Sequence, residues 1–270
     1  MAGKEQSGED AQFMHQMDGE LVGWEEPEQR LREALDQDHL CLYYQPIVSL
    51  TGAGGMAMAE ILVRLREEEE RMLPPGEFLP AFEHYRMMGE LDRWVLRHAV
   101  RKLAGGGAVR SISINASSQS IEEPGFAAYA AAQLLGAGLS PDAVVIEIEE
   151  SELIDQHAEV ERFAAEVREA GCRLMLDGFA RRSVSFEALR ALKPDFVKVD
   201  GAVTRKIVRS GSAAAKMKAI QRLGEMIGIG VVAECVEEQE VLAALKQLKV
   251  GYAQGFGVGK PEPIEKLFKT

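Results

Sequence analysis

Eight short apolar segments recur along the chain, and most are separated from the next by a longer amphipathic stretch. Their lengths and β-branched content are typical of buried strands. They cover residues 40–50, 55–65, 111–117, 143–151, 173–179, 195–201, 230–237 and 252–259. Helical spacing of apolar residues marks the intervening stretches 157–171, 212–228 and 237–248. Eight strands alternating with helices in 270 residues predict an α/β fold of the (β/α)8, TIM-like barrel type.

The connection between the first two predicted strands departs from a regular barrel. Only a short segment around Thr51-Gly52-Ala53-Gly54 separates them, which leaves no room for a crossover helix. Parallel neighbours need such a crossover, so we expect these two strands to pair antiparallel with each other. The alternative fold is an open doubly wound sheet, but the Gly-rich phosphate loop that it requires after the first strand is absent.

Residues 1–26 differ from the rest of the chain in their high charge and weak apolar periodicity. We interpret them as a flexible acidic N-terminal linker, followed by one barrel domain over residues 27–270. Asp and Glu number 43 against 31 Lys and Arg, a formal charge of −12, which argues against nucleic-acid binding. No apolar run reaches the 18 residues of a membrane span.

The three cysteines are scattered without a Cys-x-x-Cys pair. This spacing is typical neither of a disulfide framework nor of a zinc site. Each lies in or beside an apolar run, so we expect buried free thiols in a reducing compartment.

Polar residues stand near the ends of seven of the predicted strands, where TIM-like barrels carry their active sites. They are Glu60, Asn115, Glu147, Asp177, Lys198, Glu234 and Gln254. The first four are hard oxygen donors, which suit Mg²⁺, Mn²⁺ or Ca²⁺. Lys198 could neutralise developing charge or orient a water molecule, and Gln254 could hydrogen-bond in the same region. Each alone has a simpler explanation: a strand-end carboxylate can be solvated, and Lys198 can be an ion-pair partner of Asp200. The prediction rests on the whole set.

The same residues lie in motifs that resemble the EAL family, the cyclic di-GMP phosphodiesterase domains of bacterial signalling. The matching motifs, which cover about 27–270, are Gln45-Pro46-Ile47-Val48, Glu60-Ile61-Leu62-Val63-Arg64, Pro75–Pro80, Leu91-Asp92-Arg93-Trp94, Asn115-Ala116-Ser117, Ile146–Ser151, Lys198-Val199-Asp200, Ala233–Glu237 and Gln254-Gly255-Phe256. The resemblance implies a barrel with an antiparallel first strand, a bacterial cytoplasmic location and a cyclic dinucleotide ligand that metal-activated water opens.

The resemblance also implies a role for each matching residue. The residues that match ligands of a first metal ion are Glu60, Asn115, Glu147 and Asp177. The groups that match the surroundings of the nucleophilic water, the catalytic set, are Lys198, Glu234 and Gln254. The positions that match dinucleotide contacts are Gln45, Leu62, Arg64 and Asp92.

The loop after the fifth barrel strand departs from the family pattern Asp-Asp-Phe-Gly-Thr-Gly. Gly178 stands where the family has the second Asp, a ligand of the second metal, and the two later glycines are Ala180 and Arg182. Any positive φ at those two positions becomes costly. We therefore expect Mg²⁺ or Mn²⁺ at a single site at most, with the second site lost. Arg181 and Arg182 put two cations near that place and could stand in for the second ion in holding the ligand, or they could simply face solvent.

Three functions remain open from the sequence. The first is a catalytically inactive cyclic di-GMP receptor, because loss of one electrostatic stabiliser typically costs about 10²–10³ in rate while the binding positions persist. The second is a weak metal-dependent phosphodiesterase, and the third is a protein-interaction domain that no longer binds the dinucleotide. A receptor needs an output, so we expect a partner protein or fused signalling domain, and a homodimer is consistent with the family.

Overall fold

The computed structural model describes residues 26–37, 39–52, 54–66, 72–107, 109–182 and 186–268. The expected linker over residues 1–26 lies outside this range except for Glu26, as do loop residues Ser183, Val184 and Ser185. The described chain divides into two compact units. The first comprises the residues up to Cys41 together with Val63–Leu91, and the second comprises Leu42–Leu62 together with the chain from Asp92 onward.

The first unit contains helix α2 (Pro27–Asp36), strand β3 (Met72–Leu73) and helix α3 (Pro75–His84). Strands β1 (Leu40–Ser49) and β2 (Gly55–Arg66) and helix α4 (Met88–Ala104) run across the boundary between the units. Within the first unit, β3 pairs antiparallel with the last residues of β2, with Leu73 opposite Leu65. Leu31 and Ala34 are the buried residues of α2.

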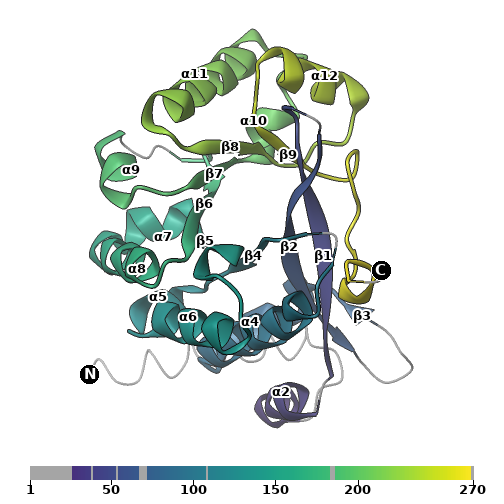
Figure 1. The fold of residues 1–270 in the computed structure, drawn as a ribbon, viewed down its shortest axis with the longest axis vertical. Coiled ribbons are helices and arrows are strands. Elements are labelled where there is room, and N and C mark those ends of the chain that lie inside the picture. The colour runs from purple at the N-terminus through teal and green to yellow at the C-terminus, as the bar shows by residue number, and fades with distance from the viewer. Residues whose placement is uncertain are drawn as a thin grey trace, which may run out of the picture. The chain divides into compact units, whose positions relative to one another are not determined.

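The second unit contains the remaining elements of the chain (Figure 1). Its further strands are β4 (Ile112–Asn115), β5 (Val144–Glu149), β6 (Arg173–Phe179), β7 (Phe196–Val199), β8 (Gly230–Ala233), β9 (Tyr252–Gln254) and β10 (Glu262–Pro263). Its helices are α5 (Ser118–Glu122), α6 (Phe126–Gly136), η2 (Pro141–Ala143), α7 (Glu150–Asp155), α8 (His157–Glu169), α9 (Phe186–Leu192), α10 (Gly201–Thr204), α11 (Gly211–Ile227), α12 (Gln239–Gln247) and η3 (Ile264–Lys266).

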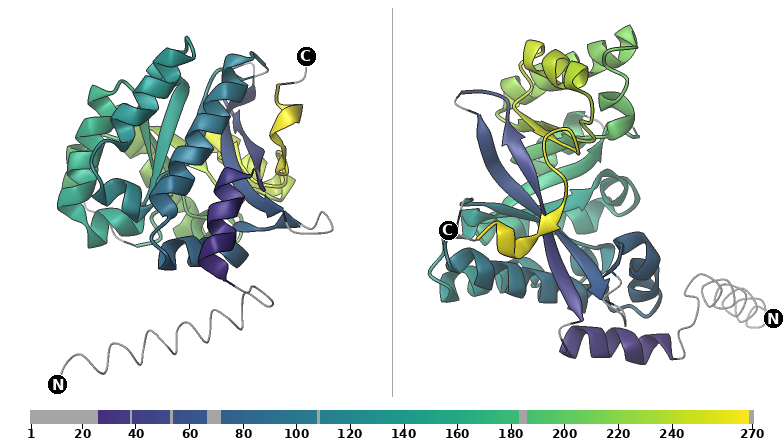
Figure 2. Two further views of the ribbon diagram at one scale, coloured as in Figure 1. Left: turned by 90° about the horizontal axis from the view of Figure 1, so that it is seen from below. Right: turned by 90° about the vertical axis from the view of Figure 1, so that its right-hand side faces the viewer.

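Eight strands form a closed barrel, which confirms the predicted fold class. The order is β1-β9-β8-β7-β6-β5-β4-β2, and β1 also pairs with β2 to close the ring. Successive pairs from β2 to β9 are parallel, whereas β1 is antiparallel to β9, as the short first connection predicted. The closing β1–β2 pair excludes the open doubly wound sheet. Near the C-terminus, β10 adds antiparallel to β1 (Figure 2).

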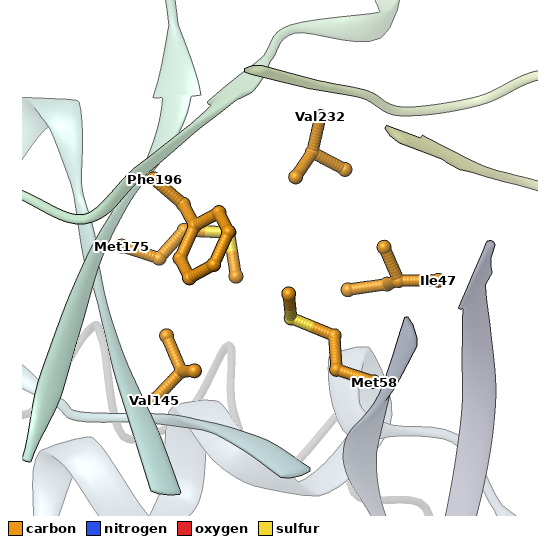
Figure 3. Close-up of a cluster of buried hydrophobic side chains, with 6 residues drawn as sticks. All are labelled: Ile47, Met58, Val145, Met175, Phe196 and Val232. Carbon is orange, nitrogen blue, oxygen red and sulfur yellow. The ribbon is translucent and has the colours of Figure 1, made fainter. Parts of the chain in front are cut away.

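The barrel interior is filled by a layer of apolar side chains that point toward one another (Figure 3). The layer consists of Ile47, Met58, Val145, Met175, Phe196 and Val232. On the parallel strands, each of these residues precedes a predicted site residue by two positions. Because side chains alternate between the two faces of a strand, the site residues form the next layer on the same inner face. On the reversed strand β1 the order is inverted, so Gln45 comes before Ile47.

The helices of the second unit bury their apolar stripes. In α8, for example, Val160, Phe163, Ala164 and Val167 are buried, as the spacing in the sequence predicted. No helix among the described residues is long and apolar enough to cross a membrane. The three cysteines are free thiols, but only Cys172 is buried, so the expected burial is wrong for the partly exposed Cys41 and Cys235.

Candidate functional site

Lys198 lies at the centre of the polar layer, at the end of β7. Its side chain is 2% exposed, and its ammonium group is surrounded by carboxylates from three other strands. The Nζ atom is 3.0 Å from Glu60 Oε2 on β2 and 3.9 Å from Asp177 Oδ1 on β6, and it donates a short hydrogen bond to Glu147 Oε2 on β5. Three predicted site residues therefore meet around a fourth, the buried ammonium of Lys198.

Glu60 accepts hydrogen bonds from side chains on two other strands, β9 and β4. Gln254 Nε2 donates to Glu60 Oε2 at 2.5 Å, and Asn115 Nδ2 donates to Oε1 at 3.2 Å. Gln254 also contacts Gln45 Oε1 at 3.3 Å, and Gln45 Nε2 donates to the carbonyl of Gly259 at 3.0 Å. The structure thus places Gln45, on the reversed first strand, beside the end of β9.

The charges of this cluster do not balance. Burial and the charges of Glu60 and Asp177 raise the pKa of Glu147 to about 8, although Lys198 opposes the shift. Burial also raises the pKa of Asp177. Glu60 is also buried, but the Lys198 ammonium and three hydrogen bonds hold its pKa below the ordinary value. The three carboxylates raise the pKa of Lys198 despite its burial, so it stays charged. One ammonium thus faces three carboxyl groups, and the raised pKa of Glu147 favours its protonated form near neutral pH, which removes one of the three negative charges.

The donor chemistry of the cluster fits one hard divalent cation. Glu147 Oε1 is buried and makes no hydrogen bond among the described residues, and the cluster carries uncompensated negative charge. The residues that could hold such an ion are all oxygen donors: Glu60, Asn115, Glu147 and Asp177. Within the described ranges, however, no three His, Cys, Asp or Glu side chains are arranged around a common cation position. The Lys198 ammonium lies among these carboxylates instead.

Glu234 directly follows β8, and the charges of Asp177 and Lys198 act on its carboxyl group. Its Oε1 accepts a hydrogen bond from the backbone N–H of Gly201 at 2.6 Å. Burial raises its pKa, and the nearby charges of Asp177 and Asp200 add to that shift. Asp200 is not the partner of Lys198, because the chain turns after β7 and Asp200 caps α10, accepting from the N–H of Ala202.

The loop after β6 is fixed by Glu150, the first residue of α7. The buried Glu150 carboxylate accepts from the backbone N–H groups of Ala180 at 2.9 Å and Arg182 at 2.6 Å. Lys216 donates to the carbonyl of Ala180 at 2.7 Å. Ala180 has φ +73° and Gly178 has φ +66°. The positive φ expected to be costly at position 180 is therefore present, and the Glu150 contacts offset that cost.

The two arginines of this loop point to different partners. Arg181 Nε donates to Asp200 Oδ2 at 2.6 Å, and its Nη1 lies 3.8 Å from Glu149 Oε2. Arg182 Nη1 instead lies 3.5 Å from Asp155 at the surface, where both side chains are more than half exposed. Arg181 is therefore adjacent to the strand ends of β5 and β7, whereas Arg182 pairs with the end of α7.

Asp92, predicted as a ligand contact, anchors the start of α5. Its Oδ2 accepts from Ser117 N at 2.8 Å, from Ser117 Oγ at 2.6 Å and from Ser120 Oγ at 2.7 Å. Ser117 is the residue before α5 and follows Asn115 by two positions. Asp92 thereby fixes the chain directly after the end of β4. This anchoring role was missed, although the Ser-rich sequence after Asn115 is a helix-start signal.

Replacement of Asp92 by alanine should lower the free energy of unfolding by about 2–4 kcal/mol, because three donors in a buried setting lose a charged acceptor. Chemical denaturation measures this loss. Asp92→Asn keeps one acceptor oxygen and should lose less. Glu28→Ala, which removes an exposed i,i+4 partner of Arg32, is the matched surface control and should change stability by under about 0.5 kcal/mol. Equal losses for Asp92→Ala and Glu28→Ala would contradict the anchoring role.

The two remaining predicted residues lie on β2. Leu62 is half-buried, two positions beyond Glu60. Arg64 belongs to the first unit, where its Nη1 donates to the carbonyl of Val63 at 3.1 Å. Glu150 and Asp200 belong to the hydrogen-bond network of this site but were not among the predicted site residues. Both follow a strand immediately, and both face the loop after β6.

The fold and the site together define a TIM-like barrel with an oxygen-rich acidic mouth at the ends of its strands. The model of the EAL domain matches residues 28–261, so the chain belongs to the EAL family. This confirms the resemblance derived from the motifs. The family includes metal-dependent phosphodiesterases.

Two curated relatives share this region of sequence. The cyclic di-GMP phosphodiesterase PdeB of Shewanella oneidensis is 32% identical over 238 residues, which is 87% of this chain and 28% of the relative. The cyclic di-GMP phosphodiesterase PdeF of Escherichia coli is 29% identical over 87% of this chain and 32% of its own length. The chain thus spans about a third of the length of the curated relatives that it matches.

Solved structures agree with the assignment. The PaMucR phosphodiesterase in complex with c-di-GMP superposes with a TM-score of 0.80 at 28% identity, covering 90% of this chain and 100% of that one. The FimX EAL domain of Xanthomonas citri in complex with c-di-GMP gives a TM-score of 0.81 at 26% identity, covering 88% of this chain and 93% of that one.

Proposed function

We propose that this chain is a cyclic di-GMP receptor domain, derived from phosphodiesterases, that hydrolyses the dinucleotide little or not at all. The observation that carries the proposal is the pair formed by Gly178 and Arg181. Gly178 offers no carboxylate, and the Arg181 guanidinium carbon lies 3.5 Å from the place that a Cβ at position 178 would occupy. The relatives bound to c-di-GMP support the choice of ligand.

In this proposal the residues keep the roles that the family resemblance implies. The dinucleotide contacts are Gln45, Leu62, Arg64, Asp92, Arg181 and Arg182. The ligands of a single Mg²⁺ or Mn²⁺ ion are Glu60, Asn115, Glu147 and Asp177. The vestigial catalytic residues are Lys198, Glu234 and Gln254. A bound divalent ion would polarise a phosphoryl oxygen or a water molecule, and the residues of this chain would orient the ligand and balance charge around it.

Guanidinium groups suit phosphate, so Arg181 is the cation proposed to meet the ligand at the loop after β6. Its Nε donates a hydrogen bond to Asp200, while the side chain remains 57% exposed. We further propose that the output passes to a partner protein or a fused signalling domain, and that the domain can form a homodimer in the cytoplasm. The share of the relatives' length that this chain covers supports a role as one module among several.

Calorimetric titration of cyclic di-GMP in the presence of Mg²⁺, followed by chromatography of the recovered ligand, tests this function. We expect saturable binding and recovery of the intact cyclic dinucleotide. Arg181→Ala should weaken binding about tenfold, the value of one charged hydrogen bond, and Arg182→Ala should weaken it less because that side chain pairs with Asp155. No heat and no conversion would contradict the receptor and leave a protein-interaction domain.

A weak phosphodiesterase is the second candidate. The observation in its favour is the complete cluster of Glu60, Lys198 and Gln254, joined by the hydrogen bonds described above. Recovery of the linear dinucleotide, dependent on Mg²⁺ or Mn²⁺ and abolished by Glu60→Ala, would establish this activity and refute the argument from Gly178.

A further inference from the structure

The backbone at Gly178 opens directly onto the side chain of Arg181. A Cβ built at Gly178 would lie 3.5 Å from Cζ of Arg181, 3.7 Å from Nη2 and 3.8 Å from Nε. All three distances are ordinary van der Waals contacts, so the guanidinium lies where a side chain at position 178 would project. With φ +66°, this position is one that Asp and Asn tolerate better than most other residues.

Two carboxylates and the loop backbone hold the guanidinium in this place. Arg181 Nε is 2.6 Å from Asp200 Oδ2, and Nη1 is 3.8 Å from Glu149 Oε2. Asp200 is only 9% exposed in its side chain. The backbone on either side of Arg181 is fixed, because Glu150 accepts from the N–H groups of Ala180 and Arg182. Contacts within the fold therefore hold the Arg181 side chain in this position.

The surroundings of this guanidinium are acidic. Asp177 precedes Gly178 directly, and the negative charges of Asp177 and Asp200 act on Glu234. A group of carboxylates this close attracts a cation, and the chain supplies one in Arg181. A carboxylate added at position 178 would therefore lie next to the guanidinium and form an ion pair with it in preference to binding an ion from solution.

We propose that Gly178 and Arg181 form a matched pair, in which the Arg181 guanidinium is a built-in cation that takes the place of a divalent ion on the β6–β7 side of the mouth. Restoring a carboxylate at position 178 would then create an ion pair with Arg181 and no metal site. A divalent ion would bind there only when the carboxylate is added and the guanidinium is removed together. This inference rests on the proposed role of Asp177 as a metal ligand, but it concerns the number of ions bound and not the affinity for a dinucleotide.

The test counts bound Mn²⁺ by isothermal titration and by electron paramagnetic resonance of free Mn²⁺. Four proteins are compared: wild type, Gly178→Asp, Arg181→Ala and the double variant. We expect each single variant to bind the same number of ions as wild type and the double variant to bind one more. Gly178→Asn combined with Arg181→Ala is the matched control, since it has the same size and φ tolerance without the charge, and it should bind no extra ion.

The outcomes separate the inference from the proposed function. An extra ion in Gly178→Asp alone would overturn the inference, because Arg181 would not be excluding it, and so would the absence of an extra ion in the double variant. Thermal midpoints give a second measurement: Arg181→Ala should lower the midpoint more in the Gly178→Asp background than in the Gly178→Asn background, and equal shifts would deny the ion pair. Cyclic di-GMP titration of wild type tests the receptor function separately.

Discussion

Replacement of Lys198 by methionine is expected to lower the free energy of unfolding of the metal-free protein by about 3–5 kcal/mol. The ammonium is the cation around which Glu60, Glu147 and Asp177 meet, and its side chain is 2% exposed. Methionine fills a similar volume but leaves two buried carboxyl groups, Glu60 and Glu147, and the half-buried Asp177 without a counter-charge. Urea denaturation at pH 7 in the presence of EDTA measures the loss.

A surface ion pair provides the control for the Lys198 variant. Lys102 Nζ is 3.2 Å from Glu265 Oε1, and the two side chains are 46% and 53% exposed. Lys102→Ala should therefore cost at most about 1 kcal/mol. A loss for Lys198→Met no greater than for Lys102→Ala would show that the ammonium does not balance the cluster. Added Mg²⁺ should raise the thermal midpoint of Lys198→Met more than that of wild type, because the uncompensated carboxylates attract it.

The second large effect is a fall in stability as the pH rises, carried by Glu147. Its pKa is raised from an ordinary value of 4.5 to about 8, so between these values the unfolded chain loses a proton that the folded protein keeps. The contribution of this proton to the free energy of unfolding is fully present below pH about 4.5 and is lost as the pH rises through about 8. The slope is at most about 1.4 kcal/mol per pH unit.

Glu147→Gln isolates this contribution, because glutamine imitates the protonated carboxyl group and cannot ionise. Denaturation curves in EDTA between pH 5 and pH 8.5 should show the variant gaining stability relative to wild type as the pH rises. Divalent ions should flatten the wild-type profile by neutralising the charge. If the two proteins changed in parallel across this range, the proton would not reside on Glu147.

Much of the fold followed from the order of strand-like segments. The Gly-containing connection at 51–54 predicted the antiparallel β1, and the spacing of apolar residues predicted helices such as α8. The polar layer followed from the same logic, since a residue two positions beyond a core residue lies on the same face of a strand. Glu60, Glu147 and Lys198 were brought together in this way.

The side-chain partners that the sequence did not predict depend on how the chain turns after each strand ends. Lys198 and Asp200 are two residues apart, yet they have different partners because α10 begins between the strand end and the next loop. Asp92 lies on α4, and no pattern near it shows that its carboxylate holds Ser117 and Ser120. The position of Arg181 above Gly178 likewise depends on Glu150 holding the backbone, a tertiary contact that spacing alone does not reveal.

The reversed direction of β1 changes how the mouth of the barrel is connected to the rest of the polypeptide. On the parallel strands, mouth residues follow the core residues, so each leads into a loop that can vary without disturbing the strand. On β1, Gln45 comes before Ile47, and five residues, about 17 Å of extended chain, separate it from Leu40 at the start of the strand. Gln45, which contacts Gln254, is therefore reached along the strand itself and not through a loop that follows a strand end.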